Sequence, residues 1–389
     1  MSEWKQYKFS DFAIVNPFVK IPKGEKISFV EMKDLEDGYR YCYPSQKRLL
    51  SGGSRFENGD TLFARITPCL ENGKICQVAK LDKNIGFGST EFHVFRGREK
   101  VSDSNFVFYL SRWRDVRDHA EMNFDGTSGR QRVPKQAFDN LFLTLPPLPE
   151  QTVIASILSS LDDKIDLLQR QKETLEKMAE TLFRQWFVVE AKEEWEAGTL
   201  DDILSVKGGS TPSTSIKGFW DGDIYWTSPK DLTNLDGIYL FNTERKITDA
   251  GLRKISSGLL PAGTLLMTSR APVGVLGFAE VSLAINQGYI AIIDNKGFSK
   301  EFIYLWLKTN MDYVQSYSNG STFMEISKSA FKLLELQLPP VELRVRFQEL
   351  IIPIFHKIKL NLKQKNSLAK MRDALLPKLM SGELKINDT

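Results

Sequence analysis

One segment of the sequence occurs twice, and this repeat constrains the architecture more than any other feature. The first copy runs from Leu145 to about Phe187 and the second from Leu338 to about Met380, without a gap, 193 positions further along the chain. Each copy begins Leu-Pro-Pro. A repeat of this length predicts two structurally equivalent segments within one protein.

Both copies have the apolar spacing of a long helix. In the first copy, apolar residues follow a 4-3-4-3 pattern, which favours a left-handed coiled coil. The double proline at the start of each copy suits the beginning of a helix. We therefore predict two long helices that bury their apolar seams on each other, with these seam residues: Ile154, Leu158, Leu161, Ile165, Leu168, Leu175, Leu182, Phe347, Ile351, Ile354, Ile358, Leu368 and Leu375.

The second copy has a weaker seam. Asn361, Lys365 and Arg372 interrupt its apolar pattern, and Pro377 is expected to end the helix. The first copy carries apolar residues off the seam, which are either a second face for another protein or additional packing against the rest of the chain: Ile157, Leu167, Met178, Phe183 and Phe187.

The segments that precede the two helices are rich in short alternating stretches and glycine turns. This pattern is typical of loop-rich β units, each with one helix, expected near residues 105–117 and 301–311. The second unit repeats the plan of the first only in part. We therefore predict an α+β protein with two β-rich globular domains in pseudo-two-fold repeat, at residues 1–144 and 191–337, with helical segments at 145–190 and 338–389.

The sequence lacks the motifs of common enzyme classes. It has no phosphate-binding loop, no dinucleotide-binding glycine motif, no GxSxG elbow and no HExxH helix. The three cysteines and three histidines have no metal-ligand spacing, and Asn16-Pro-Phe is interpreted as an ordinary turn. Reduced thiols and the absence of a leader or an 18-residue apolar run favour a cytoplasmic protein. The net charge of +3 does not by itself indicate a partner.

The loops of both globular segments carry hydroxyls, amides and cations next to glycine. Such groups suit phosphate oxygens and base edges, although the same residues are also common in solvated turns. Because two such segments are joined to paired helices, we predict contact with one long partner, double-stranded DNA, through these residues: Arg65, Thr67, Asn72, Lys74, Thr127, Ser128, Arg130, Gln131, Arg132, Lys207, Ser210, Thr211, Ser213, Thr227, Lys230, Ser269, Arg270, Asn286, Gln287, Ser321 and Thr322.

The order of these motifs resembles the DNA-sequence specificity subunit of type I restriction–modification systems over the whole chain. The resemblance is carried by Gly126-Thr-Ser, Val133-Pro-Lys, the Leu145 repeat start and Lys207-Gly-Gly-Ser-Thr-Pro-Ser. The second helix lacks the Glu-Gln that follows the prolines in the first, and the first globular segment lacks a Gly-x-Thr-Pro-Ser opening. These departures bear on individual contacts rather than on the family.

The resemblance implies a protein without catalytic activity of its own. Each globular domain would read one half of a bipartite, asymmetric DNA target, and two antiparallel helices would set the spacing between the half-sites. Two methyltransferase subunits would dock on the chain, and restriction–translocation subunits could join them. S-adenosylmethionine, Mg and ATP would bind only to those partners, so no cofactor or metal is expected in this chain. The alternatives are a coiled-coil scaffold without a DNA role and a specificity subunit of a related, non-type-I system.

Overall fold

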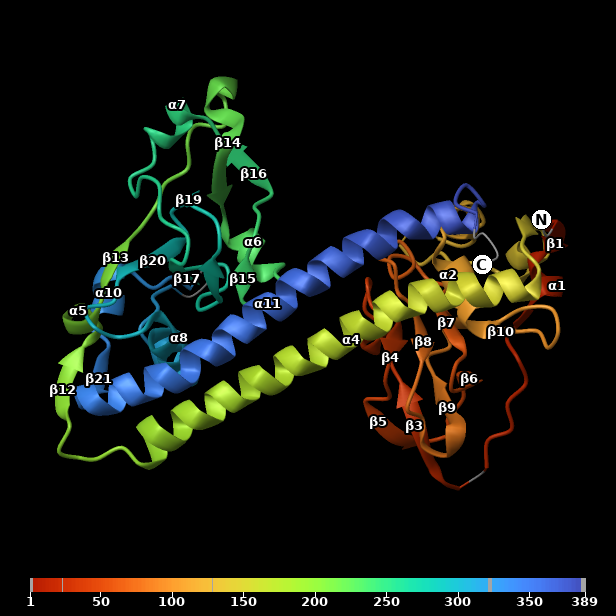
Figure 1. Ribbon diagram of the computed structural model, residues 1–389, viewed down its shortest axis with the longest axis horizontal. Helices are drawn as coiled ribbons and strands as arrows, with labels where there is room; N and C mark the ends of the chain where they lie inside the picture. Colours follow the sequence, from red (N-terminus) through yellow and green to blue (C-terminus); the bar gives the residue numbers. More distant parts are fainter. Residues whose placement is uncertain (1–2, 23, 128, 321–323, 386–389) are drawn as a thin grey trace. The chain divides into compact units, whose positions relative to one another are not determined.

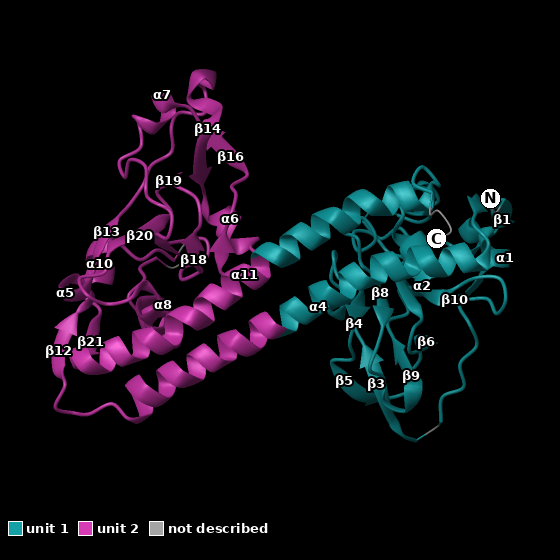
Figure 2. Ribbon diagram, viewed as in Figure 1, with its two compact units in different colours: residues 1–170, 363–389 teal, residues 171–362 magenta. Residues whose placement is uncertain are grey.

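The computed structural model describes residues 3–22, 24–127, 129–320 and 324–385 (Figure 1). The chain forms two compact units (Figure 2). Unit 1 comprises residues 1–170 and 363–389, and unit 2 comprises residues 171–362. Each unit therefore contains one β-rich head together with parts of two long helices. In the following, the first head extends from β1 to β11 and the second head from β12 to β21.

The two copies of the repeat form the long helices α4 (Leu148–Arg184) and α11 (Val341–Met380). Both begin directly after a double proline, whose fixed φ and missing N–H fit a helix start. A π-helical turn (Gln185–Val189) follows α4. The prediction that Pro377 ends the second helix is wrong, because α11 continues to Met380. Proline has a helical φ, and the single hydrogen bond that it removes here falls in the last turn, so the helix tolerates it.

The first head contains a five-stranded sheet in the order β2-β10-β7-β8-β4, a four-stranded sheet β5-β3-β9-β6 and the pair β1-β11. One helix was predicted near residues 105–117. The backbone of Trp113 is extended and divides this segment into two helices. The bounds are β1 (Lys5–Lys8), α1 (Phe9–Phe12), β2 (Ala13–Val15), β3 (Lys26–Val30), β4 (Tyr41–Cys42), β5 (Gln46–Leu49), β6 (Ser54–Glu57), β7 (Thr61–Ala64), β8 (Ile75–Val78), β9 (Ile85–Gly88), β10 (Phe92–Gly97), α2 (Ser104–Arg112), α3 (Arg114–Met122) and β11 (Phe142–Leu145).

The second head contains a five-stranded sheet in the order β13-β20-β17-β18-β15, a three-stranded sheet β16-β14-β19 and the pair β12-β21. The bounds are β12 (Glu196–Thr199), α5 (Leu200–Ile203), β13 (Ser205–Lys207), β14 (Trp220–Thr227), α6 (Pro229–Thr233), β15 (Tyr239–Leu240), β16 (Arg245–Ile247), α7 (Asp249–Leu252), β17 (Leu265–Thr268), β18 (Leu276–Ala279), β19 (Leu283–Ile285), β20 (Tyr289–Asp294), α8 (Lys300–Thr309), α9 (Met311–Ser316), α10 (Lys328–Lys332) and β21 (Glu335–Leu338).

The two heads have the same strand order when β2 is matched with β13, β10 with β20, β7 with β17, β8 with β18 and β4 with β15. In both, a short strand that precedes the matched hairpin in the chain pairs in parallel with the second strand of that hairpin: β4 pairs with β8, and β15 with β18. Each head also has a strand held between one antiparallel and one parallel neighbour, β3 in the first and β14 in the second. The predicted fold of two related domains with long helices is thus confirmed, and the heads are more alike in topology than in sequence.

In unit 1, the two helices run antiparallel and meet the first head through buried polar groups. Asp162 accepts hydrogen bonds from Arg372 at 2.6 Å and from the Tyr109 hydroxyl at 2.7 Å. Arg372 also donates to the carbonyl of Gly38, and Lys365 donates to the side chain of Gln169 at 3.1 Å. The polar residues that interrupt the predicted seam are therefore buried and paired, which is the arrangement that burial of charge requires.

In unit 2, the corresponding contacts are mainly aromatic. The Phe347 ring on α11 lies 4.8 Å from the ring of Phe187, in the π-helical turn after α4. It lies 6.0 Å from the ring of Phe183, in the last turn of α4. The amide of Asn361 donates to Gln171 at 3.2 Å. The side chain of Phe183 is buried, so this off-seam residue packs inside the unit rather than on a free face. All predicted seam residues are buried or half-buried in the unit to which they belong.

Candidate nucleic-acid interface

In the first head, the segment after β7 meets the segment after α3. Ile66 forms an isolated β-bridge with Arg132, which also bridges Asp125. The backbone N–H of Thr67 donates to the carbonyl of Gln131 at 3.0 Å, and the Gln131 N–H donates to the Thr67 hydroxyl at 3.2 Å. The structure therefore brings together four of the residues predicted to bind DNA, Arg65, Thr67, Gln131 and Arg132, although they lie more than sixty positions apart in sequence.

Arg130 and Arg132 differ in what their guanidinium groups contact. Arg132 donates from Nε and Nη2 to the Glu91 carboxylate at 2.8–3.0 Å, and from Nη1 to the carbonyl of Arg130 at 3.1 Å. These contacts hold Arg132 against Glu91 and against the backbone of Arg130. The side chain of Arg130 is exposed and makes no hydrogen bond within the described part of the chain, so its donors are available to a partner.

The remaining predicted residues of the first head lie around this bridge. Asn72 is exposed, and its N–H closes the turn after Thr67 by donating to the carbonyl of Pro68 at 2.9 Å. The Lys74 ammonium donates to the carbonyl of Met32 at 2.8 Å and is therefore held inside the head. Thr127 is exposed, whereas Ser128 lies outside the described residues.

In the second head, the segment after β13 lies across β14. The Thr211 hydroxyl donates to the side-chain carbonyl of Gln287 at 2.7 Å, and Ser210 donates to the carbonyl of Lys254 at 3.0 Å. The Ser269 N–H in turn donates to Gly288, next to Gln287, at 2.8 Å. A continuous chain of contacts thus joins the predicted residues from Thr211 through Gln287 to Ser269 and Arg270.

Other predicted residues of the second head have partners within the protein. Thr227 is fully buried, and its hydroxyl lies 3.0 Å from that of Tyr289. The ammonium of Lys207 donates to the carbonyl of Ser257 at 3.3 Å, and Lys230 forms an exposed ion pair with Glu244. The side-chain oxygen of Asn286 accepts from the N–H of Gly288 at 2.8 Å. Ser213 is exposed, and its hydroxyl lies 2.8 Å from that of Ser215. Ser321 and Thr322 lie outside the described residues.

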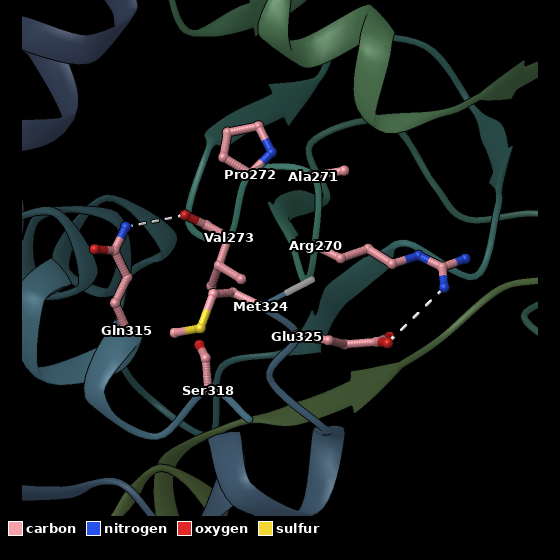
Figure 3. A pocket seen from close by; sticks show the side chains of 8 residues that line it. All are labelled: Arg270, Ala271, Pro272, Val273, Gln315, Ser318, Met324 and Glu325. Carbon is pink, nitrogen blue, oxygen red and sulfur yellow. Dashed lines mark hydrogen bonds and ion pairs between the residues drawn. The ribbon is translucent and has the colours of Figure 1, made fainter. Parts of the chain in front are cut away.

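A cavity of about 580 Å³ opens beside Arg270 (Figure 3). Arg270 forms an isolated bridge with Glu325, and their side chains form an ion pair at 3.8 Å. Val273 and Met324 supply apolar walls, and Gln315 donates to the carbonyl of Val273 at 3.1 Å. This bridge follows β17 as the Ile66–Arg132 bridge follows the matched strand β7. Each bridge contains an arginine that pairs with a carboxylate, which is Glu91 in the first head and Glu325 in the second.

A buried histidine supports the bridge of the first head and predicts a pH dependence. His93 Nε2 lies 2.8 Å from the Val133 carbonyl, and Nδ1 lies 3.3 Å from the amide nitrogen of Asn16, an arrangement that suits the neutral ring. Burial, with smaller effects of the Arg65 and Lys135 charges, lowers the pKa of His93 to about 4. The unfolded chain therefore binds a proton at His93 more tightly than the folded chain does. The contribution of neutral, buried His93 to the free energy of unfolding is fully present above pH ~6.5 and is lost as the pH falls toward 4.

We therefore expect the free energy of unfolding of unit 1 to decrease between about pH 6.5 and pH 4. Denaturant titrations across this range would measure the decrease. The matched variant is His93→Gln, which keeps a donor for Val133 but does not titrate, so its curve is expected to be flatter than that of the natural protein. Equal slopes for both proteins would show that His93 is not the group responsible.

One part of this surface was not predicted from the sequence. Arg245, Trp220 and Trp226 lie together on β14 and β16, with the arginine over the tryptophan rings. A pair of tryptophans six positions apart in a strand with a nearby arginine is the signal that could have indicated it. Among the described residues, no group of three histidine, cysteine or acidic side chains could hold a metal ion.

Both halves of the chain match one family model, described as the type I restriction modification DNA specificity domain, over residues 1–177 and 192–370. The chain belongs to this family. The two matched regions each include one head and most of the long helix that follows it, so the specificity domain occurs twice. No helix within the described residues has the length and apolar character needed to cross a membrane.

Individual relatives agree with the family match. The HindI specificity subunit of Haemophilus influenzae is 25% identical, and the alignment covers 99% of this chain and 100% of that relative. The MjaIX specificity subunit of Methanocaldococcus jannaschii is 41% identical over 42% of this chain and 38% of that relative. The solved S subunit of a type I restriction-modification system from M. genitalium has a TM-score of 0.60 and 16% identity, covering 99% of this chain and 97% of that structure. At this identity, the likeness supports the fold alone.

Proposed function

We propose that this member of the specificity-domain family is a non-catalytic DNA-recognition subunit, in which each head reads one half of a bipartite target. The observation that carries the proposal is that both heads share one strand order, whereas the residues at matched surface positions differ. The bridge after β7 pairs Ile66 with Arg132, and the bridge after β17 pairs Arg270 with Glu325. Unlike side chains on one scaffold suit unlike base sequences, so the target is expected to be asymmetric.

The long helices carry a repeated set of exposed apolar residues that suits two copies of one partner. Leu167 on α4 is 38% exposed, and its repeat equivalent on α11, Leu360, is 46% exposed. Ile157 and Met178 are likewise exposed, as are their equivalents Leu350 and Met371. Apolar residues exposed at equivalent positions indicate protein contacts. We propose that two methyltransferase subunits dock here and that the helical segments 145–190 and 338–389 set the half-site spacing between recognition domains 1–144 and 191–337.

The relatives are named as subunits of restriction enzymes, which supports further restriction–translocation partners. In this proposal, S-adenosylmethionine, Mg and ATP bind to the partner subunits, and this chain supplies sequence recognition. The proposed location is the cytoplasm, where such a complex has access to DNA. The proposed DNA contacts are the surface residues around the two bridges, led by Arg130 in the first head and Thr211, Gln287 and Arg270 in the second.

A methylome tests the proposal. The chain would be co-expressed with its methyltransferase in a host without other DNA methylation, and modified bases would be located by sequencing. Methylation at one split, asymmetric motif is the expected result. If the methyltransferase is active with another specificity subunit but produces no motif with this chain, the DNA-recognition proposal is wrong and the scaffold alternative is favoured.

The proposed docking residues lead to a prediction about stoichiometry. Leu167→Asp and Leu360→Asp are each expected to remove one of two bound methyltransferases, and the double variant both, with binding weakened at least about tenfold per site because an anion replaces an apolar contact. Mass photometry of the complexes measures the number of copies bound. Ser156→Asp, which adds the same charge at another exposed position of α4, is the control and is expected to bind two copies. Two bound copies on the double variant would place the docking surface elsewhere.

A further inference from the structure

The second head holds one arginine over the ring of one tryptophan and close to that of a second. The guanidinium carbon of Arg245 on β16 lies 3.4 Å from the centre of the Trp220 ring and 5.8 Å from that of Trp226, both on β14. The two indole rings are almost fully buried and meet edge to face at 5.1 Å. Arginine stacks well on aromatic rings, and the stack fixes the plane of its fork of N–H donors.

The same two tryptophans hold the loop after β13. The Trp226 indole N–H donates to the carbonyl of Ser210 at 3.4 Å, and the Trp220 indole N–H donates to the carbonyl of Ser213 at 3.1 Å. Arg245 is therefore part of the contact chain that contains Ser210, Thr211 and Gln287. Its position on this surface places it beside groups that the proposed function assigns to DNA.

The guanidinium of Arg245 has no carboxylate partner. It forms no ion pair or hydrogen bond with any residue that the structure describes, whereas its neighbour Glu244 pairs with Lys230 at 3.0 Å. The side chain is exposed. Stacking on the tryptophans uses the face of the guanidinium. Its N–H donors point outward at the edge of the stack and are available to a partner.

The first head also has an arginine stacked on an aromatic ring, but this arginine has an acidic partner. Arg48 on β5 stacks on Phe29 of β3, with its guanidinium carbon 4.2 Å from the ring centre. The strands β5 and β3 occupy the place of β16 and β14 beside the matched sheet. Arg48 is, however, paired with the carboxylate of Glu31. An arginine stacked on an aromatic ring at matched strands of both heads indicates a shared surface, and of these two arginines only Arg245 lacks an acidic partner among the described residues.

We propose that Arg245 is a specificity-determining residue of the second head that reads a guanine through its major-groove edge. Arg245 lies on β16, the edge strand of the three-stranded sheet β16-β14-β19, and guanine O6 and N7 form the acceptor pair that a planar arginine fork matches. The inference rests on the proposed function, because it names the base that one head recognises. Lysine cannot reproduce the two parallel hydrogen bonds.

The test compares methylomes of the complex formed by the full-length chain and its methyltransferase. Arg245→Ala and Arg245→Lys are both expected to lose discrimination for guanine, by about 5- to 100-fold, at a single position in one half-site, with the other half-site unchanged. Arg253→Ala removes another exposed arginine of the same head and serves as the matched control, with an unchanged motif expected.

Three results would overturn the inference. An unchanged motif in both Arg245 variants would show that the residue does not read a base. A uniform loss of methylation at all sites, without a change of preference, would assign Arg245 to a phosphate. If the natural protein itself yields no bipartite motif, the proposed function fails, and the inference fails with it. A natural motif that survives Arg245 replacement refutes the inference alone, so the two failures are distinguishable.

Discussion

Replacement of Arg372 by alanine is expected to destabilise unit 1 by about 3–5 kcal/mol, because it leaves a buried carboxylate without its charged partner. The side chains of Arg372 and Asp162 are 4% and 1% exposed. The remaining donor to Asp162 is Tyr109, a neutral hydroxyl whose pKa is raised by burial and which therefore stays protonated.

Denaturant unfolding of the full chain, followed by hydrogen exchange in unit 1, would measure this loss. The double variant Asp162→Leu with Arg372→Met is expected to recover most of the stability, because a buried ion pair can often be replaced by apolar residues of similar volume. Lys370→Ala, on an exposed position two residues away, is the control and should change stability by no more than about 0.5 kcal/mol. An equally small effect for Arg372→Ala would mean that the ion pair with Asp162 does not contribute to the stability of unit 1.

Truncation of Phe347 to alanine is expected to cost about 3–5 kcal/mol of stability in unit 2. The ring is almost completely buried and contacts the rings of Phe183, Phe187 and Phe302. Removal leaves a cavity between aromatic side chains that cannot close without moving both helices and α8. The loss therefore includes the transfer of the ring and the cavity that remains.

Leu350→Ala is the matched control for this variant, because Leu350 lies three residues further along α11 and its side chain is 48% exposed. Its truncation is expected to change the free energy of unfolding by no more than about 0.5 kcal/mol. Hydrogen exchange should also show the effect of Phe347→Ala in unit 2 before unit 1. A loss below about 1 kcal/mol for Phe347→Ala would mean that the aromatic cluster repacks around the gap.

Several features of this protein follow from local sequence alone. The repeat, the double prolines and the 4-3-4-3 apolar spacing predicted two long helices, and both are present as α4 and α11. Glycine turns and short alternating runs likewise predicted β-rich heads. These features depend on helix and strand periodicity, which is written in neighbouring residues and needs no knowledge of distant contacts.

Only the tertiary structure shows which partners contact the charged side chains of Arg372 and Arg245. Arg372 reads as an interruption of an apolar seam, and only the fold brings Asp162, more than two hundred positions earlier, within hydrogen-bonding distance. Arg245 reads as an ordinary exposed strand residue until Trp220 and Trp226 are placed beneath it. The physical reason is the same in both cases. A local pattern specifies which side chains need burial, but the partner that satisfies a buried charge or stacks on an arginine is chosen by long-range packing of separate strands and helices.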